Sequence, residues 1–297
     1  MKILLLGAKG QVGWELQRSL APFGQLKICD RTTVDFEDTR QLQLVVRQFA
    51  PTVIVNAAAY TAVDLAESEV DKAFSVNAKA VEILAIEARS LGAWLIHYST
   101  DYVFDGKKSG AYVETDTPNP QSVYGRSKLQ GEEAIRASGC LHLIFRTSWV
   151  YATRGANFIK TMVRLAKERD ELKVVADQFG APTSAELIAD VTALCLFGLN
   201  SSSINSKNLS GTYHLVAAGE TSWHGFVQYM VSAAQKNGEV FRVTSDKIQA
   251  ITTEQYPTPA KRPANSRLES KKIAKTFKLL MPSWQTHVDR MIAEIVN

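Results

Sequence analysis

Two groups of residues in this chain have the types and the spacing needed for hydride transfer. Gly7, Gly10 and Gly13 follow an apolar run at the N-terminus, and Tyr124 stands four residues before Lys128. A glycine turn between a strand and a helix lets the backbone approach a pyrophosphate, which the N–H groups of the helix N-terminus then bind. The tyrosine and the lysine fall on one helix face, where an ammonium group lowers the pKa of a phenol toward the working range. Together they predict a nicotinamide-dependent enzyme.

Each motif also has a simpler interpretation. The glycines can serve a tight turn alone, and a tyrosine four residues before a lysine is often a surface pair. The spacing Gly-x-x-Gly-x-x-Gly differs from the Gly-x-Gly-x-x-Gly of most dinucleotide-binding dehydrogenases. The order of the two motifs on an α/β pattern favours the enzymatic interpretation, since either motif alone is weak evidence.

The second predicted strand ends in two residues that favour different cofactors. Asp30, 20 residues after Gly10, stands where an acid pairs with the adenosine ribose of NADH. Arg31 follows at once, and a guanidinium there suits the 2′-phosphate of NADPH. We therefore predict that both cofactors are used. The alternative is a solvated strand end.

A hydroxyl near the end of the fourth predicted strand completes the acid–base set. Thr100 lies 24 residues before Tyr124, and its hydroxyl is suited to polarise a substrate carbonyl. Ser99 is the rival candidate for this role.

The elements that position these residues follow an α/β pattern. Apolar runs of strand length alternate with stretches of helical period, which predicts a Rossmann-type, doubly wound parallel sheet. The predicted strands are 2–6, 26–29, 52–56, 94–99 and 142–146, and the predicted helices are 12–20, 39–49, 72–90 and 124–137.

The pattern loosens after residue 146. We expect helices over 157–168 and 185–199, a strand near 172–175, a polar linker or mobile loop over 200–210 and a strand over 211–215. A helix after Ser222 and a last one over 284–295 flank a proline-rich loop. We therefore divide the chain into a cofactor domain, 1–150, to which 157–215 contributes in part, and a mainly substrate-binding lobe, 216–297.

Composition narrows the class of protein. The chain has 297 residues and a net charge of +4, with no basic block, which argues against nucleic acid as a partner. Three scattered cysteines form no disulfide framework, so we expect a reducing, cytoplasmic location. No apolar run reaches the ~20 residues of a membrane span, and we expect no membrane association.

Several longer stretches resemble one family, the extended short-chain dehydrogenases that act on nucleotide sugars, and within it the dTDP-4-dehydrorhamnose reductases. The similarity runs nearly end to end. It is carried by residues 10–16 (GQVGWEL), 55–64 (VNAAAYTAVD), 99–104 (STDYVF), 145–151 (FRTSWVY) and 256–268 (YPTPAKRPANSRL).

This resemblance implies roles for individual residues. Tyr124 would be the proton donor, Lys128 its activator, and Thr100, Asp101 and Trp149 would hold the sugar, although Trp149 also suits a core position. Arg262 and Arg267 would pair with the nucleotide diphosphate, although each also suits a solvated surface. The implied cofactor contacts are Gly10, Gln11 and Val12 at the pyrophosphate, Asp30 at the ribose, Asp35 and Phe36 at the adenine, and Ala59, Tyr60 and Thr61 toward the nicotinamide. The residue patterns above add Gly7, Gly13 and Arg31 to the predicted cofactor site, together with Tyr124 and Lys128, whose ammonium can reach ribose hydroxyls of the cofactor.

The resemblance also implies a homodimer that holds Mg²⁺ where subunits meet, through Glu15, Glu186 and Glu294. Oxygen ligands suit this ion. From the sequence alone, these are glutamates on three predicted helices, and solvated helix faces are the alternative.

One departure favours reduction over dehydration. The related nucleotide-sugar dehydratases carry Thr-Asp-Glu where this chain has Thr100, Asp101 and Tyr102. Without the glutamate, elimination of water lacks an acid–base partner.

We therefore expect NADPH- or NADH-dependent reduction of the 4-keto group of dTDP-6-deoxy-L-lyxo-4-hexulose to dTDP-L-rhamnose. Two alternatives stay open. One is reduction of another 4-keto nucleotide sugar. The other is a non-catalytic, dinucleotide-binding partner protein, because the regulatory subunit of methionine adenosyltransferase resembles the same family.

Overall fold

Six parallel strands form the central sheet, in the order β10-β5-β4-β3-β1-β2. The computed structural model describes residues 1–200 and 206–296, so part of the predicted loop at 200–210 lies outside the described residues. The strands confirm the predicted α/β fold, and β10 joins the main sheet beside β5. Their bounds are β1 Lys2–Leu6, β2 Gln25–Cys29, β3 Val53–Asn56, β4 Trp94–Thr100, β5 Leu141–Thr147 and β10 Gly211–His214.

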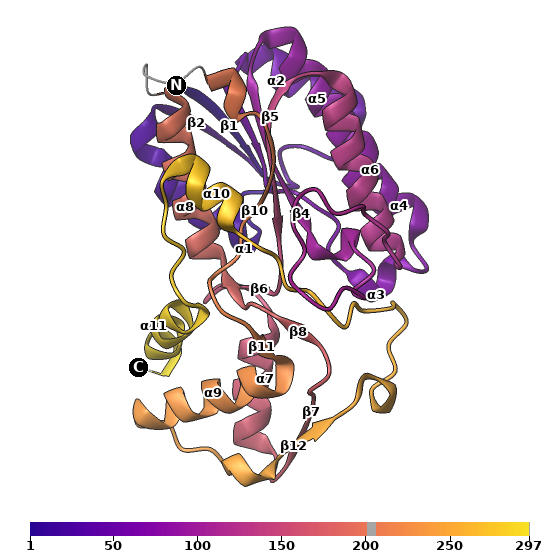
Figure 1. Ribbon diagram of the computed structural model, residues 1–297. Helices are drawn as coiled ribbons and strands as arrows, with labels where there is room; N and C mark the ends of the chain where they lie inside the picture. The colour runs from indigo at the N-terminus through magenta and orange to yellow at the C-terminus, as the bar shows by residue number, and fades with distance from the viewer. Residues whose placement is uncertain (201–205, 297) are drawn as a thin grey trace.

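Alternate residues of the inner strands enter two different cores. Ile3 and Leu5 pack on the face covered by α1 and α8, whereas Leu4 and Leu6 pack under α2 and α5. Figure 1 shows α6 beside α5 on this second face. Burial on both faces explains why the strands are continuous apolar runs. The helices are α1 Gln11–Leu20, α2 Thr39–Phe49, α5 Ala80–Leu91, α6 Val123–Ser138 and α8 Ala185–Asn200.

The helix predicted over 72–90 is present, but it is not a uniform α-helix. The structure has α4 (Val70–Phe74), a π-helical turn over Ser75–Lys79 and then α5. The turn buries Asn77, whose amide bonds the backbone N–H and carbonyl of Tyr60 and the hydroxyl of Ser127. A period count misses such a turn because these partners come from other parts of the chain.

A smaller lobe lies below the sheet (Figure 1), where α7 packs against α9 and β7 pairs with β12. It shares its core with the α1 and α8 face of the sheet. The element α10 (Lys271–Phe277) returns to the sheet and contacts β10 and α8. The elements of the lobe are α7 Phe158–Glu168, β7 Leu172–Val175, α9 Trp223–Lys236, β12 Ile248–Ile251 and α11 Trp284–Val296.

The strand order places the ends of β1 and β3 at a reversal point. The chain builds outward from β1 to β2, then crosses to β3 and continues the other way. Ligands of open α/β sheets bind at such a point, outside the carboxyl ends of the strands. The glycine turn follows β1 and residues 57–61 follow β3, so both meet at this edge.

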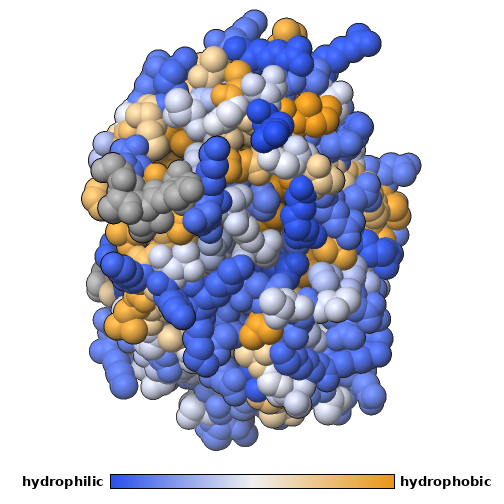
Figure 2. Space-filling model, turned by 45° about the horizontal axis from the view of Figure 1, so that its top comes forward, coloured by the Kyte–Doolittle hydropathy of each residue, from blue (hydrophilic) through white to orange (hydrophobic). Residues whose placement is uncertain are grey.

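The exposed surface is mainly polar on the face that Figure 2 shows, with hydrophobic residues in small separate groups. Among the described helices, none is both long and apolar enough to cross a membrane.

Candidate active site

The glycine turn after β1 is packed too tightly for side chains. Gly7 has φ +79°, and a Cβ there would lie 2.4 Å from the backbone nitrogen of Ala58. A Cβ on Gly13 would lie 2.1 Å from the carbonyl oxygen of Gly7. Gly10 caps α1, so Gln11 and Val12 present the first helical N–H groups at this turn. The turn therefore has the close backbone approach and the helix N-terminus that a pyrophosphate requires.

A second cation stands at the end of β2. Lys9 Nζ lies 2.7 Å from Asp30 Oδ2, and Thr32 also donates to this carboxylate. These hydrogen bonds lower the pKa of Asp30 below its usual range, with the bond from Lys9 the largest cause. Arg31 is exposed. The sequence reasoning missed Lys9, whose ammonium partly neutralises the acid expected to select NADH.

The remaining predicted cofactor residues line the same edge. Asp35 and Phe36 follow β2, with Phe36 packed against the core under α2. Ala59, Tyr60 and Thr61 follow β3, and the Asn77 amide holds the backbone of Tyr60. The tyrosine hydroxyl donates to Glu69 Oε2 at 2.9 Å.

The two candidate hydroxyls of β4 point to opposite sides, as neighbours on a strand do. The Thr100 hydroxyl faces the Tyr124 phenol and lowers the pKa of that phenol. The Ser99 hydroxyl instead faces buried Glu132 and lowers the pKa of that carboxyl, although it has no hydrogen-bond partner within bonding distance among the described residues. The Ser122 side chain caps α6 through the N–H of Gly125, which fixes the start of the helix that carries Tyr124. Thr100 is therefore the hydroxyl that the fold places beside the phenol.

The structure does not show the predicted effect of Lys128 on the pKa of Tyr124, and the role of the lysine as activator stays a prediction. Burial, and the charge of Asp101, raise the pKa of Tyr124 to about 12, and Lys128 is not among the causes. The lysine turns inward, where Nζ donates to the Tyr98 carbonyl at 2.6 Å and lies 3.2 Å from His97 Nε2. A raised pKa keeps the proton on the phenol, as a proton donor requires.

Asp101 is a buried carboxyl beside this pair. Burial raises its pKa to about 6, against hydrogen bonds from Ser266 and Thr100 that lower it. Thr100 Oγ1 donates to Asp101 Oδ1 at 3.1 Å. The contact with Ser266 brings the predicted loop over 256–268 to the end of β4.

Trp149 forms an aromatic wall next to β5. Its ring stacks on Trp223 at a centroid distance of 3.6 Å, and its backbone has φ +49°. A Cβ on Gly180 would lie 2.7 Å from the Trp149 ring. A bulky residue in the left-handed region persists only where its surroundings enforce it, which is common at ligand sites.

The two arginines of the C-terminal loop already have partners. Arg262 forms an ion pair with Asp64 at 2.9 Å. Arg267 donates to Asn265 Oδ1 and to the Ser109 carbonyl, and lies 3.3 Å from Glu220. Each would have to change partner to bind a diphosphate.

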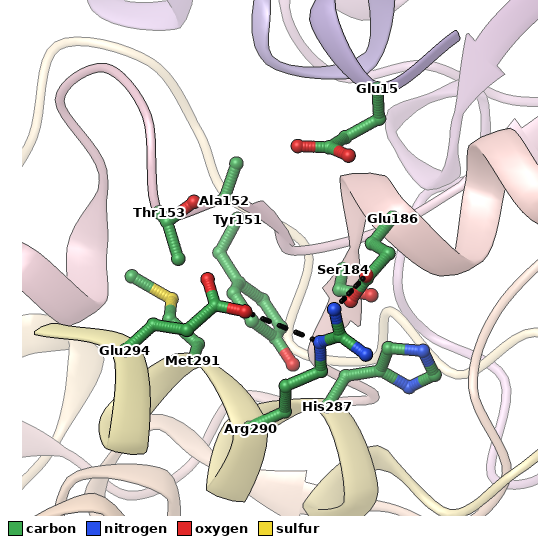
Figure 3. Close-up of a pocket in the computed structure, with 10 residues that line it drawn as sticks. All are labelled: Glu15, Tyr151, Ala152, Thr153, Ser184, Glu186, His287, Arg290, Met291 and Glu294. Atoms are coloured by element: carbon green, nitrogen blue, oxygen red, sulfur yellow. Dashed lines mark hydrogen bonds and ion pairs between the residues drawn. The ribbon is translucent and has the colours of Figure 1, made fainter. Parts of the chain in front are cut away.

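The three glutamates predicted for Mg²⁺ meet around one pocket, which Figure 3 shows between α1, α8 and α11. Arg290 lies between them, 3.0 Å from Glu186 and 3.3 Å from Glu294. Burial raises the pKa of Glu15, and the charges of the other two add to this. The described residues hold no group of three acidic, histidine or cysteine side chains placed to bind a metal. As they stand, the side chains form an ion-paired cluster, and magnesium stays a prediction.

Replacing Asp101 by Asn should stabilise the protein increasingly as the pH rises from about 4 to about 6. The folded state holds the proton of Asp101 up to about pH 6, so above that pH the wild type bears the cost of a buried charge. The variant should gain up to about 3 kcal/mol relative to wild type over this window and nothing further above it. Urea unfolding at a series of pH values measures this difference.

Asp105→Asn is the matched control. Its pKa is lowered, chiefly by the N–H of Lys107, so its carboxylate stabilises the fold above the unfolded pKa. This variant should lose stability relative to wild type as the pH rises to about 4, and the difference should stay constant between about pH 4 and 6. If the difference in unfolding free energy between Asp101→Asn and wild type does not change with pH, the raised pKa of Asp101 is contradicted.

Known proteins match this chain over its full length. The family model described as RmlD substrate binding domain matches residues 1–297. The dTDP-4-dehydrorhamnose reductase of Escherichia coli K12 is 50% identical and is aligned over 99% of this chain and 98% of its own. That of Burkholderia thailandensis is 47% identical, with both chains fully covered.

Solved structures agree. A dTDP-4-dehydrorhamnose reductase from Clostridium acetobutylicum has a TM-score of 0.90 at 35% identity, covering 99% of both chains. One from Bacillus anthracis, in complex with NADP, has a TM-score of 0.89 at 36% identity, covering 99% of this chain and all of its own. With the glycine turn and the Thr100–Tyr124 pair at one edge of the sheet, these matches show that the chain belongs to the dTDP-4-dehydrorhamnose reductase family.

Proposed function

We propose that this protein reduces the 4-keto group of dTDP-6-deoxy-L-lyxo-4-hexulose to give dTDP-L-rhamnose, with NADPH or NADH. The observation that carries this proposal is the Thr100 hydroxyl beside the Tyr124 phenol, at the sheet edge where the glycine turn also lies. Family membership over the whole chain supplies the substrate class.

The residues divide the chemistry between them. A reduced nicotinamide, when bound, supplies the hydride to C4 of the sugar. Tyr124 donates its proton to the carbonyl oxygen, and Thr100 hydrogen-bonds that oxygen as its negative charge develops. Lys128, one helical turn from the tyrosine, compensates the charge of the phenolate that remains. The backbone N–H groups of Gln11 and Val12 hold the pyrophosphate.

We assign substrate binding to the smaller lobe and the strand ends above it. Trp149 and Trp223 offer a stacked aromatic surface, and Asp101 offers a buried carboxyl for a sugar hydroxyl. Arg262 would exchange Asp64 for the diphosphate of the nucleotide. Residues 216–297 form most of this lobe in our assignment, with α7 and β7 added from the preceding segment.

Two alternatives are tested by the same assay. Another 4-keto nucleotide sugar would give turnover with a different product. A non-catalytic partner protein would give none, and it has no chemical need for Thr100 beside Tyr124. The buried, free cysteines suit the reducing cytoplasm that we propose as its location.

Tyr124→Phe should lower kcat about 10²–10⁴-fold because it removes the proton donor and keeps the ring. The assay follows nicotinamide absorbance with the 4-keto sugar made in situ from dTDP-glucose. Tyr229→Phe is the matched control, since its hydroxyl contacts Asp289 on the smaller lobe. A near-wild-type rate for Tyr124→Phe would mean that another group is the acid.

Both cofactors should support turnover, with kcat/KM values within about a thousandfold of each other. Arg31→Ala should lower kcat/KM for NADPH about ten- to hundredfold, the loss of one charged hydrogen bond, and leave NADH nearly unchanged. An equal loss of kcat/KM with both cofactors would show that Arg31 does not recognise the 2′-phosphate.

We also propose a homodimer formed through one face of α8. Glu186, Asp190, Leu194 and Phe197 share this face, and the last two are 51% and 68% exposed. Phe197→Glu should reduce the mass in solution from about twice the 32.8 kDa chain to a single chain. Leu44→Glu, at an exposed position of α2, is the control and should not change it.

Arg290 already pairs with two of the three pocket glutamates, so we expect the dimer mass to persist in a metal chelator. A fall to the mass of one chain in chelator would instead assign the contact to a divalent cation.

A further inference from the structure

A chain of three buried polar side chains connects β3, β4 and α6. Asn56 ends β3, His97 is its register partner on β4, and Lys128 reaches them from α6. Their exposures are 1%, 0% and 2%. Asn56 Nδ2 lies 3.2 Å from His97 Nδ1, and His97 Nε2 lies 3.2 Å from Lys128 Nζ. Each group therefore depends on its neighbours for hydrogen bonds.

The orientation of the Asn56 amide is set by the backbone. The N–H of Ala58 donates to Asn56 Oδ1 at 3.1 Å, so the amide oxygen faces Ala58 and the NH₂ group faces His97. His97 Nδ1 must then accept a hydrogen bond. A neutral imidazole that accepts at Nδ1 carries its proton on Nε2.

This tautomer directs an N–H group at Lys128. An ammonium group at Nζ has only donors, so it cannot accept a hydrogen bond from the Nε2–H of His97. A neutral amine has a lone pair, which accepts this hydrogen bond. The amine still donates to the Tyr98 carbonyl, 2.6 Å away. The geometry is consistent when His97 is the donor and Lys128 is uncharged.

We propose that His97, oriented by Asn56, is a positioning residue that holds Lys128 inward as a neutral amine in the cofactor-free enzyme. Protonation of Lys128 occupies the lone pair of its amine, which can then no longer accept a hydrogen bond from His97. The lysine side chain is thereby released from His97. The charge that compensates the Tyr124 phenolate therefore depends on the tautomer of a histidine that touches neither substrate nor cofactor. The compensation of the phenolate charge rests on the proposed reductase function, but the tautomer of His97 does not.

The charges around the chain agree with this assignment. Burial lowers the pKa of Lys128 to about 8, against the charge of Glu132, which raises it, so the neutral amine is the main form above about pH 8. Glu132 itself is held by Arg146 and Arg136. The pKa of His97 is lowered well below its usual value, by burial and then by Lys128. The charge of Asp101 raises the pKa of Tyr124 and is not among the causes that shift the pKa of Lys128.

The test measures the tautomer directly. Full-length protein labelled with ¹⁵N-histidine, free of cofactor, is studied by long-range ¹H–¹⁵N NMR between about pH 6 and 9. We expect His97 to be protonated at Nε2 alone throughout. A proton at Nδ1, or an imidazolium, would overturn the proposal. The resonances of His97 are identified by their loss in His97→Gln.

Asn56→Asp supplies a second test that keeps every heavy-atom position. The carboxylate accepts from Nδ1–H, which reverses the tautomer and makes Nε2 an acceptor for an ammonium group. We expect the NMR signature to switch to Nδ1–H. An unchanged Nε2–H tautomer in this variant would contradict the orienting role of Asn56.

The pH profile separates this role from a purely structural one. In His97→Gln, the alkaline limb of kcat/KM should move up by about 1 pH unit, a tenfold change in the ionisation constant of Lys128. A structural role would lower the rate at every pH without moving the limb. His142→Gln, on β5, is the control and should leave the profile unchanged. If NMR shows the expected His97 tautomer but the enzyme does not turn over the 4-keto sugar, the proposed function is refuted and the positioning role of His97 is not.

Discussion

A buried ion pair between α6 and β5 holds the catalytic helix on the sheet. Arg146 donates to both carboxylate oxygens of Glu132, at 2.9 and 2.7 Å, and the two side chains are 3% and 0% exposed. The Arg146 guanidinium also lies over the Phe104 ring. Losing one partner of such a pair typically costs about 3–5 kcal/mol, because the other charge stays buried. The pair fixes α6 one turn beyond Lys128, and with it the height of Tyr124 over the strand ends.

This anchoring explains how the site separates its charges. Glu132 and Arg146 neutralise each other inside the domain, so the lysine sees a compensated neighbour rather than a free carboxylate. Tyr124 stays protonated beside Thr100, and Asp101 is buried enough for its pKa to rise to about 6. The result is a site whose phenol keeps its proton, which suits a reaction that creates an anion on the substrate oxygen.

The C-terminal loop closes the site through ordinary polar contacts. Asn265 Nδ2 donates to the carbonyls of Lys108 and Gly110, Ser266 reaches Asp101, and Arg262 pairs with Asp64. Residues about 150–200 positions apart thus meet at the ends of β3 and β4. These contacts join the two lobes beside the proposed substrate surface.

The sequence predicted the elements whose signals are local. The strands β1 and β7 and the helix α2 have the predicted bounds, because buried runs and helical periods are set by neighbouring residues. The glycine spacing and the Tyr124–Lys128 interval likewise indicated the candidate active site, at the carboxyl ends of the strands. Ser99 and Thr100 were equivalent in the sequence, and only the side of β4 that each faces separates them.

Tertiary structure alone decided the features that depend on distant partners. The π-helical turn exists because Asn77 bonds Tyr60 and Ser127, and β10 joins the main sheet because β5 had an open edge. The pairing of Arg290 with Glu186 and Glu294 is equally invisible to spacing. Lys128 points inward rather than toward Tyr124, because the packed strands provide hydrogen-bond partners for its buried nitrogen at His97 and at the Tyr98 carbonyl. A sequence states which groups are present, but their protonation and direction follow from the partners that folding brings within hydrogen-bond distance.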